Sequence, residues 1–366
     1  MKKLSFLCLL ITTFCYSQKF KIDTLLTDKI SIRAIQLWDG KVWYAGTDSK
    51  FGYVNMKDKA DKKQIVFSDK KLQFRTLAQN KKSFFAINIE SPAYFFQIDK
   101  KTLDFKVVFN DNDTTAFYDA LKFVDNDFGI AFSDPTNNQR LNISQTRNGG
   151  KKWVHCNDCK NFPYLEKGEA AFAASNTNIA SAGDAIWIAT GGKKSRIYRM
   201  RNKDCDWKVF ETPFTQGTSS QGIYSIDFYS NTSGIAVGGD YTKQADNINN
   251  IATTNDGGQT WQIQASGQNA GYMTCVKFRP NTKGKEIVAV GDQHISFSSD
   301  YGKTWTKISD EKDLYACEWL NHDTLILAGK DKILKITFIT DIAEVIVVKP
   351  VKLNEKKMKV NANNTY

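Results

Sequence analysis

Short apolar stretches recur along the chain and alternate with polar segments rich in Gly, Asp, Asn and Ser. Each stretch has an alanine near its centre, and glycine often follows. The seven alanines are Ala45, Ala86, Ala131, Ala189, Ala236, Ala289 and Ala328, with successive spacings between 39 and 58 residues. Short apolar runs bounded by turn residues are typical of buried β-strands, and a regular repeat of this length is typical of radial repeat folds.

A second apolar stretch precedes each alanine and has a small residue at one position. These residues are Ala34, Thr76, Ala120, Ala173 or Ala174, Ser225, Cys275 and Cys317. Small side chains suit innermost strands that crowd around a common axis. With two further strands after each alanine, the sequence predicts an all-β fold, a seven-bladed β-propeller of four-stranded antiparallel blades. The seventh unit lacks a fourth strand after residues 332–339, so we expect residues 20–26 to supply it and close the ring.

One turn motif occurs three times, at residues 298–305, 254–261 and 146–153. The first copy reads Ser-Ser-Asp-Tyr-Gly-Lys-Thr-Trp. Asp or Asn accepts hydrogen bonds from the following backbone N–H groups, Gly tolerates a positive φ, and Trp anchors the hairpin in the core. We expect a structural role for its main positions: Asn148, Gly150, Trp153, Asp256, Gly258, Trp261, Asp300, Gly302 and Trp305.

These copies resemble the Asp-box, or bacterial neuraminidase (BNR) repeat, Ser/Thr-x-Asp-x-Gly-x-Thr-Trp. The order of the units is similar to that of the photosystem II stability/assembly factor-like propellers, within the wider sialidase and sortilin-type group. The resemblance implies a propeller with its Asp-boxes on the edge away from the ligand face. It says little about function, because Asp-boxes occur in sialidases, xyloglucan hydrolases, sortilin-type receptors and non-enzymatic assembly factors.

The N-terminus has the pattern of a signal peptide. Lys2 and Lys3 precede an apolar run at residues 4–14 that is too short to span a bilayer, and small residues place the cleavage between Ser17 and Gln18. We therefore predict a signal peptide at 1–17, a propeller at 18–345 and a basic, disordered tail at 346–366. The predicted protein is exported, periplasmic or secreted, has no transmembrane segment and is a monomer.

The formal net charge is +11, carried mostly by scattered lysines. Lys/Arg blocks interleaved with stacking aromatic residues are missing, which argues against nucleic-acid binding. A basic surface attracted to anionic polymers of the cell envelope fits this distribution better.

Charged residues predicted near the inner ends of the strands supply the ligand-face candidates: Glu169, Arg33, Arg75, Asp119, Asp134, Asp240 and Asp292. Arg33, Arg75 and Asp119 precede the small residue of the first three units, so we expect them to meet in the channel as an ion-pair network or an anion site. For the acids, ordinary turn chemistry remains open. For Glu169, near the channel mouth, a packing role remains open.

Five of the seven cysteines follow the predicted cleavage point, so at least one is unpaired within the chain. Cys156 and Cys159 have the spacing of a redox motif but follow Trp153 rather than open a helix. We predict a local disulfide between them, with Cys205 as the competing partner. Cys275 and Cys317 are expected to be buried free thiols. With three histidines in the chain, we predict no metal site.

The sequence favours an exported, non-enzymatic propeller that binds a protein or glycan of the cell envelope, as an assembly or stability factor does. No cofactor is predicted, because no Gly-x-Gly-x-x-Gly opens a helix. Two alternatives stay open. One is a sialidase-like glycoside hydrolase with a carboxylate pair at the channel mouth, although the early Arg-Ile-Pro-type motif of those enzymes is missing. The other is an oxidoreductase, as some relatives are labelled.

Overall fold

The computed structural model describes residues 19–135, 138–156, 159 and 161–339. The predicted signal peptide with Ser17 and Gln18, and the predicted tail at 346–366, lie outside the described residues. No helix in the described ranges is long and apolar enough to cross a membrane.

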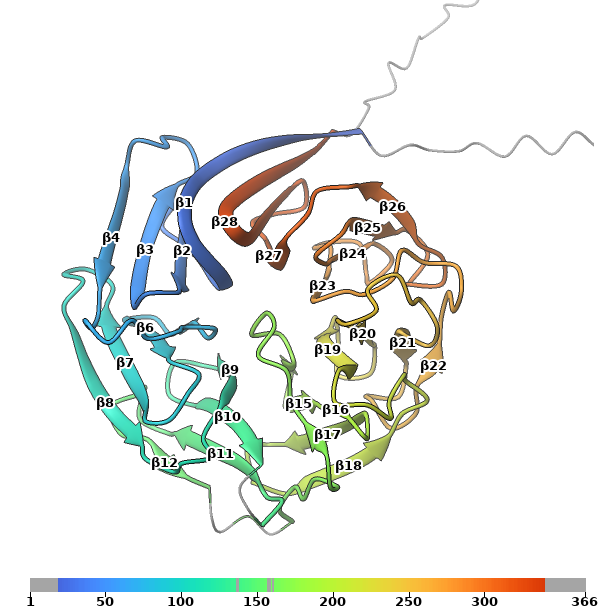
Figure 1. Cartoon of the computed structure of the whole chain (residues 1–366), viewed down its shortest axis with the longest axis horizontal. Helices are drawn as coiled ribbons and strands as arrows, with labels where there is room; N and C mark the ends of the chain where they lie inside the picture. The colour runs from blue at the N-terminus through green and yellow to red at the C-terminus, as the bar shows by residue number, and fades with distance from the viewer. Residues whose placement is uncertain (1–18, 136–137, 157–158, 160, 340–366) are drawn as a thin grey trace, which may run out of the picture.

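The described elements are antiparallel β-strands in sheets that surround a central axis like the blades of a propeller (Figure 1). Four sheets have four strands each. They are β5 (Ala78–Gln79), β6 (Ser83–Ile87), β7 (Ala93–Asp99) and β8 (Phe105–Asp111); β9 (Tyr118–Phe123), β10 (Gly129–Pro135), β11 (Leu141–Thr146) and β12 (Val154–His155); β14 (Ile179–Ala182), β15 (Ala185–Ala189), β17 (Arg196–Arg201) and β18 (Trp207–Glu211); and β23 (Cys275–Phe278), β24 (Ile287–Val290), β25 (Ile295–Ser298) and β26 (Thr306–Ser309).

Two further sheets have six strands each. One runs in the order β27 (Leu314–Trp319), β28 (Thr324–Ile339), β1 (Lys19–Trp38), β2 (Lys41–Gly46), β3 (Lys50–Asn55) and β4 (Lys62–Val66). The other runs in the order β13 (Glu169–Ala170), β16 (Gly191–Gly192), β19 (Gln221–Phe228), β20 (Gly234–Asp240), β21 (Ile251–Thr254) and β22 (Gln262–Ile263).

The predicted propeller of four-stranded blades is therefore confirmed, but the described residues form six sheets rather than seven separate ones. The difference arises because β1 and β28 are long and continuous. The first part of β1 pairs with β28, from Phe20 opposite Phe338 to Leu26 opposite Ile333, and its last part pairs with β2. Two predicted units thus share one sheet, and residues 20–26 pair with β28 where the sequence placed them.

The core lies between neighbouring sheets. All seven predicted alanines are fully buried. A cluster that includes Trp43 from β2 and Phe84 from β6 shows how two sheets meet, with ring centroids 4.6 Å apart. Because alanine has a small side chain, it lets the large rings of adjacent sheets interlock at the density of a protein interior.

The turn at residues 298–305 is closed by its own side chains. Ser298 Oγ accepts the N–H of Gly302 at 3.0 Å, Asp300 Oδ1 accepts the N–H of Thr304 at 2.9 Å, and Trp305 Nε1 donates to the carbonyl of Gly302 at 2.9 Å. Gly302 has φ +83°, a value that favours glycine. The Asp300 carboxylate is therefore occupied by the turn.

The other two copies repeat this arrangement. In the second, the N–H of Gly258 donates to Thr254 Oγ1 at 2.9 Å and the N–H of Thr260 donates to Asp256 Oδ1 at 3.0 Å. The indole N–H of Trp261 donates to the carbonyl of Gly258 at 3.1 Å. In the third, Gly150 N–H donates to Thr146 Oγ1 at 3.0 Å and Lys152 N–H to Asn148 Oδ1 at 2.9 Å. Within the described residues the indole N–H of Trp153 has no hydrogen-bond partner, although its ring lies 5.1 Å from that of Phe95.

Candidate functional site: a pocket on the propeller axis

Residues 171–178, here called the crossing segment, run through the centre of the propeller. Ser175 Oγ donates to the carbonyl of Thr274 at 2.7 Å, and Asn176 Oδ1 accepts the N–H of Leu121 at 2.8 Å. The carbonyl of Thr177 accepts the N–H of Ile226 at 2.8 Å. In Figure 1 this is the green loop near the axis, between β9 and β19. The segment therefore contacts several sheets at once and divides the axial space.

The sequence placed an innermost strand at Ala173 or Ala174, and this prediction is wrong. The structure starts β14 at Ile179 and leaves both alanines in the crossing segment. The hydrogen bonds of Ser175, Asn176 and Thr177 go to Thr274, Leu121 and Ile226. Because these partners belong to other parts of the propeller, the segment does not pair as a strand of its own blade.

A cavity of about 340 Å³, here called the axial pocket, lies against the crossing segment. Its lining consists of Arg33, Arg75, Phe117, Ala171, Phe172, Ala173, Ala174, Ser219, Tyr224, Tyr241, Tyr272 and Asp292. The size falls within the usual range for small-ligand sites. The pocket therefore contains three of the ligand-face candidates, Arg33, Arg75 and Asp292.

Two arginines from neighbouring blades reach the crossing segment. Arg33 Nη1 donates to the carbonyl of Ala174 at 3.0 Å, and its guanidinium lies over the ring of Tyr315 at 3.9 Å. Arg75 Nη1 donates to the carbonyl of Ala173 at 3.4 Å. Burial, followed by repulsion from Arg33, lowers the pKa of Arg75. Since a guanidinium has five N–H donors, both side chains retain donors for an anionic ligand.

Aromatic rings form one wall of the pocket. Phe172 of the crossing segment stacks on Tyr224 with centroids 3.9 Å apart, and Tyr272 meets Tyr224 edge-on at 4.9 Å. Tyr224 donates its hydroxyl hydrogen to the carbonyl of Ser220 at 2.8 Å. This wall offers a rigid apolar surface beside the two arginines. No sequence pattern indicates this wall, because the three rings come from separate elements.

Among the lining residues Asp292 supplies a carboxylate. It is half-buried and accepts a hydrogen bond from Gln244 Nε2 at 2.9 Å. Burial raises the pKa of Asp292, and the nearby Arg33 partly opposes this. Asp292 follows the end of β24, whereas the turn with Asp300 lies at its start, where Ile287 pairs with Ser298. The turn motif and the axial pocket are therefore at opposite ends of this blade.

The other acidic candidates lie outside the pocket lining. Asp240 accepts hydrogen bonds from the backbone N–H and hydroxyl of Thr242 at 2.9 and 2.6 Å, which is ordinary turn chemistry. Asp134 accepts the N–H of Ala171 at 3.0 Å, so it fixes the start of the crossing segment. Burial raises the pKa of Asp134 to about 6.

The expected ion-pair network of Arg33, Arg75 and Asp119 is not formed. Asp119 is fully buried, and neither carboxylate oxygen has a hydrogen-bond partner in the described part of the chain. Burial and the charge of Asp134 raise the pKa of Asp119 well above its usual range, against a smaller opposite effect of Arg75. Such a group is favoured in its neutral form.

Glu169 lies in the core rather than at an open mouth. Its carboxylate pairs with Arg196 Nε at 3.1 Å and accepts the hydroxyl hydrogens of Thr190 and Tyr198 at 2.5 and 3.1 Å. Only 2% of its surface is exposed. With every oxygen engaged, Glu169 holds β13 and β17 together and is not available to a ligand.

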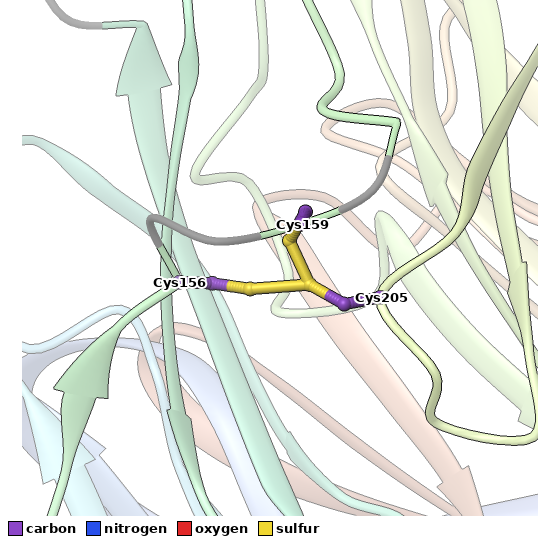
Figure 2. A group of neighbouring side chains, drawn as sticks. All are labelled: Cys156, Cys159 and Cys205. Carbon is purple, nitrogen blue, oxygen red and sulfur yellow. A yellow bond between two sulfur atoms is a disulfide. The ribbon is translucent and has the colours of Figure 1, made fainter.

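The cysteines differ from the prediction in their pairing. In Figure 2 the sulfur atom of Cys205 lies between those of Cys156 and Cys159, and because a sulfur atom forms one disulfide at a time, these two cysteines are alternative partners of Cys205. Cys205, the competing partner, takes this place because the turn between β17 and β18 brings it against the connector after β12. Cys275 and Cys317 are buried free thiols, as predicted.

The chain matches no protein-family model and no curated protein. Among solved structures it is similar to YCF48 bound to D1 peptide, with a TM-score of 0.61 and 13% identity over 88% of this chain and 97% of that chain. It is also similar to YCF48 from Cyanidioschyzon merolae (TM-score 0.60, 13% identity, 87% and 98%) and to U3-55K (TM-score 0.60, 11% identity, 86% and 98%). At these identities the likeness shows that the chain shares the β-propeller fold.

Proposed function

We propose that this chain is a non-enzymatic propeller that binds a segment of a partner protein in the axial pocket. The observation that carries the proposal is the crossing segment. It fills the centre of the propeller and supplies Phe172 to the pocket wall and two carbonyls that orient Arg33 and Arg75. The axial pocket is therefore a concave site in which the N–H donors of Arg33 and Arg75 are already oriented, rather than an open central channel.

The chemistry of the pocket suits a peptide that carries a carboxylate next to an apolar or aromatic side chain. Arg33 and Arg75 supply charge-assisted N–H donors, which match a carboxylate in geometry and charge. The rings of Tyr224 and Tyr272 are already ordered by their contacts, so binding against them costs little side-chain entropy. One of the similar folds is YCF48 bound to D1 peptide. That likeness supports a peptide as the class of ligand.

The finer parts of the proposal rest on the sequence. We include export to the periplasm or beyond, a monomeric state, an envelope assembly or stability role and the Asp-box identity of the three turns. Their common hydrogen bonds support that identity. We also count seven blade units, because β1 and β28 each contribute to two units and would close the ring between the chain ends.

A glycan partner and the two enzymatic alternatives receive less support. A glycosidase needs two carboxylates on either side of a bound sugar. In the described pocket lining Asp292 is a single carboxylate, while Glu169 and Asp240 are held by their own neighbours. No observation of the described residues favours an oxidoreductase.

The test compares the proteins recovered from an envelope extract by wild type and by the Arg33→Ala/Arg75→Ala variant. Each charge-assisted hydrogen bond contributes about 1.5–3 kcal/mol, so we expect the double variant to lose at least about tenfold in partner recovery. The matched control is Arg201→Ala, since Arg201 pairs with Asp184 at 3.1 Å outside the pocket. Equal recovery by the double variant, with an unchanged unfolding transition, would refute the proposal. Cell fractionation tests export separately.

A further inference from the structure

Three cysteines from two parts of the chain meet at the outer side of the propeller. Cys156 and Cys159 lie in the connector after β12, and Cys205 lies in the turn between β17 and β18. Their three sulfur atoms lie within 4.8 Å of one another. A sulfur atom forms one disulfide at a time, so pairing alone always leaves one of the three as a thiol.

The Cα–Cα distances show which of the two cysteines is better placed for a disulfide with Cys205. The Cα atoms of Cys159 and Cys205 are 4.8 Å apart, which is within the range of disulfides. Those of Cys156 and Cys205 are 7.9 Å apart, beyond the limit of about 7 Å for a bridge without backbone movement. Cys156 is therefore held close to the other two sulfurs but at a poor distance for bonding to Cys205.

A metal ion fits this arrangement because it satisfies all three sulfurs together. Zinc–sulfur bonds of about 2.3 Å in a tetrahedral site place the sulfurs about 3.8 Å from one another, compared with about 2 Å in a disulfide. The longer span accommodates the wide Cα separation of Cys156 and Cys205. Cys-x-x-Cys is one half of the common four-ligand zinc patterns, and Cys205 adds a third thiolate from another hairpin.

The surroundings favour a soft cation. The cluster packs against core residues that include Leu165 and Trp207, and the N–H of Cys205 donates to Met200 Sδ at 3.2 Å. Cys156 is buried, whereas Cys159 and Cys205 are partly exposed and leave a route for an ion. Thiolates in an apolar setting select zinc or copper(I) over hard cations such as calcium or magnesium.

His155 is directed to other partners. Its Nδ1 lies 3.2 Å from Ser144 Oγ, and its Nε2 lies 3.8 Å from Asp111 Oδ1. Its ring also meets that of Phe109 edge-on at 5.2 Å. These contacts occupy the imidazole, so a fourth ligand would come from solvent or from a bound molecule.

We propose that Cys156, Cys159 and Cys205 of the reduced protein form a three-thiolate site for one thiophilic cation of the zinc or copper(I) class. The ion binds as the thiols release their protons. It joins the connector after β12 to the turn after β17, and hence two neighbouring sheets. A two-electron oxidant, such as the disulfide of a thiol–disulfide exchange partner, instead takes two electrons from Cys159 and Cys205, which form a disulfide and release the ion; that partner is reduced to a dithiol, Cys156 remains a thiol, and no site is left.

The test is an anaerobic titration of the reduced, metal-free full chain with Zn²⁺ against a chromophoric chelator. We expect one Zn²⁺ per chain and at least about tenfold weaker binding in Cys156→Ser, Cys159→Ser and Cys205→Ser, since even residues that only support metal ligands change affinity by about 10–100-fold. His155→Ala and Cys317→Ser are the matched controls and should bind normally. Absence of 1:1 binding, or unchanged binding in Cys156→Ser, would overturn the proposal.

Two further measurements separate ligand loss from misfolding. Reduced protein with Co²⁺ should show thiolate-to-metal charge-transfer absorption that each ligand variant loses while its metal-free unfolding midpoint stays unchanged. After oxidation, peptide mapping should find Cys159 linked to Cys205, and Zn²⁺ binding should disappear. Retained Zn²⁺ binding in the oxidised chain would contradict the proposal.

Discussion

Asn176 Oδ1 accepts the backbone N–H of Leu121 across the propeller axis at 2.8 Å, although 55 residues separate them in the chain. The Asn176 amide also donates to the carbonyls of Leu77 and Leu121 at 2.9 and 3.2 Å. Its φ of +60° is a left-handed conformation that Asn tolerates better than most residues. One side chain thus joins two blades to the crossing segment, whose Ala173 and Ala174 line the axial pocket.

We predict that Asn176→Ala lowers the free energy of unfolding by about 2–4 kcal/mol, because buried backbone groups lose their partners. Urea denaturation followed by tryptophan fluorescence measures the loss. The matched control is Asn281→Ala, at an exposed Asn with φ +64°, which should cost only the backbone strain of about 1 kcal/mol. An equal loss in both variants would contradict the role of the amide.

The second prediction concerns Gly150, in the turn motif at residues 146–153. Gly150 has φ +82°, and an added Cβ would lie 2.2 Å from Cε1 of the buried Phe85 ring. Gly150→Ala should therefore cost about 2–5 kcal/mol, from left-handed strain and overpacking together. Gly40→Ala isolates the strain, since Gly40 has φ +69° and open space around its Cβ, and should cost about 1–2 kcal/mol. Thermal and urea unfolding of both variants provide the comparison.

The parts of the fold that could be predicted from sequence depend on short-range patterns. Strand alternation with a central alanine, and the turn at 298–305, involve residues within a few positions of one another. The pairing of residues 20–26 with β28 was also predictable, because a missing strand at one end of the chain matched a spare apolar strand at the other. The sheet count was wrong because nothing local marks β1 and β28 as continuous strands.

The residues of the axial pocket are brought together by contacts between distant parts of the chain, which no local sequence pattern predicts. Arg33 and Arg75 were found because they occupy equivalent positions before a small residue in successive units. Glu169 was misplaced because its partner Arg196 comes from another strand, and an acid near a glycine looks like an open loop residue. The polar residues Ser175 and Asn176 were the one sequence feature that could have indicated that the crossing segment is not a strand.

The buried pair of Glu169 and Arg196 gives a third prediction. Glu169→Ala leaves the guanidinium buried without its main partner, so we expect a loss of about 3–5 kcal/mol in the free energy of unfolding. The double variant Glu169→Ala/Arg196→Met removes the orphaned charge and should be more stable than Glu169→Ala alone. A double-variant cycle by urea denaturation measures this coupling. Additive losses would show that the pair does not act as a unit.

Asp134 gives a prediction about pH. Burial raises its pKa from 3.8 to about 6 in the folded protein, so the folded state holds this proton more tightly than the unfolded state. The contribution of Asp134 to stability is therefore greatest below pH 4 and falls as the pH rises through about 6. Asp134→Asn keeps an acceptor for the N–H of Ala171 and removes the charge. Relative to wild type it should gain on the order of 2 kcal/mol at pH 7.5 and little at pH 3.5.

Asp240→Asn is the control, because the pKa of Asp240 is shifted in the opposite direction from that of Asp134. Burial acts to raise the pKa of Asp240, but hydrogen bonds from Thr242 outweigh it and lower the pKa. The folded state therefore favours the charged carboxylate, and the stability this supplies is present above the unfolded pKa and lost as the pH falls through the folded one. Asp240→Asn should thus destabilise the protein at pH 7.5 relative to pH 3.5. Urea titrations at both pH values test the pair, and a pH-independent difference between Asp134→Asn and wild type would show that the Asp134 proton is not linked to folding.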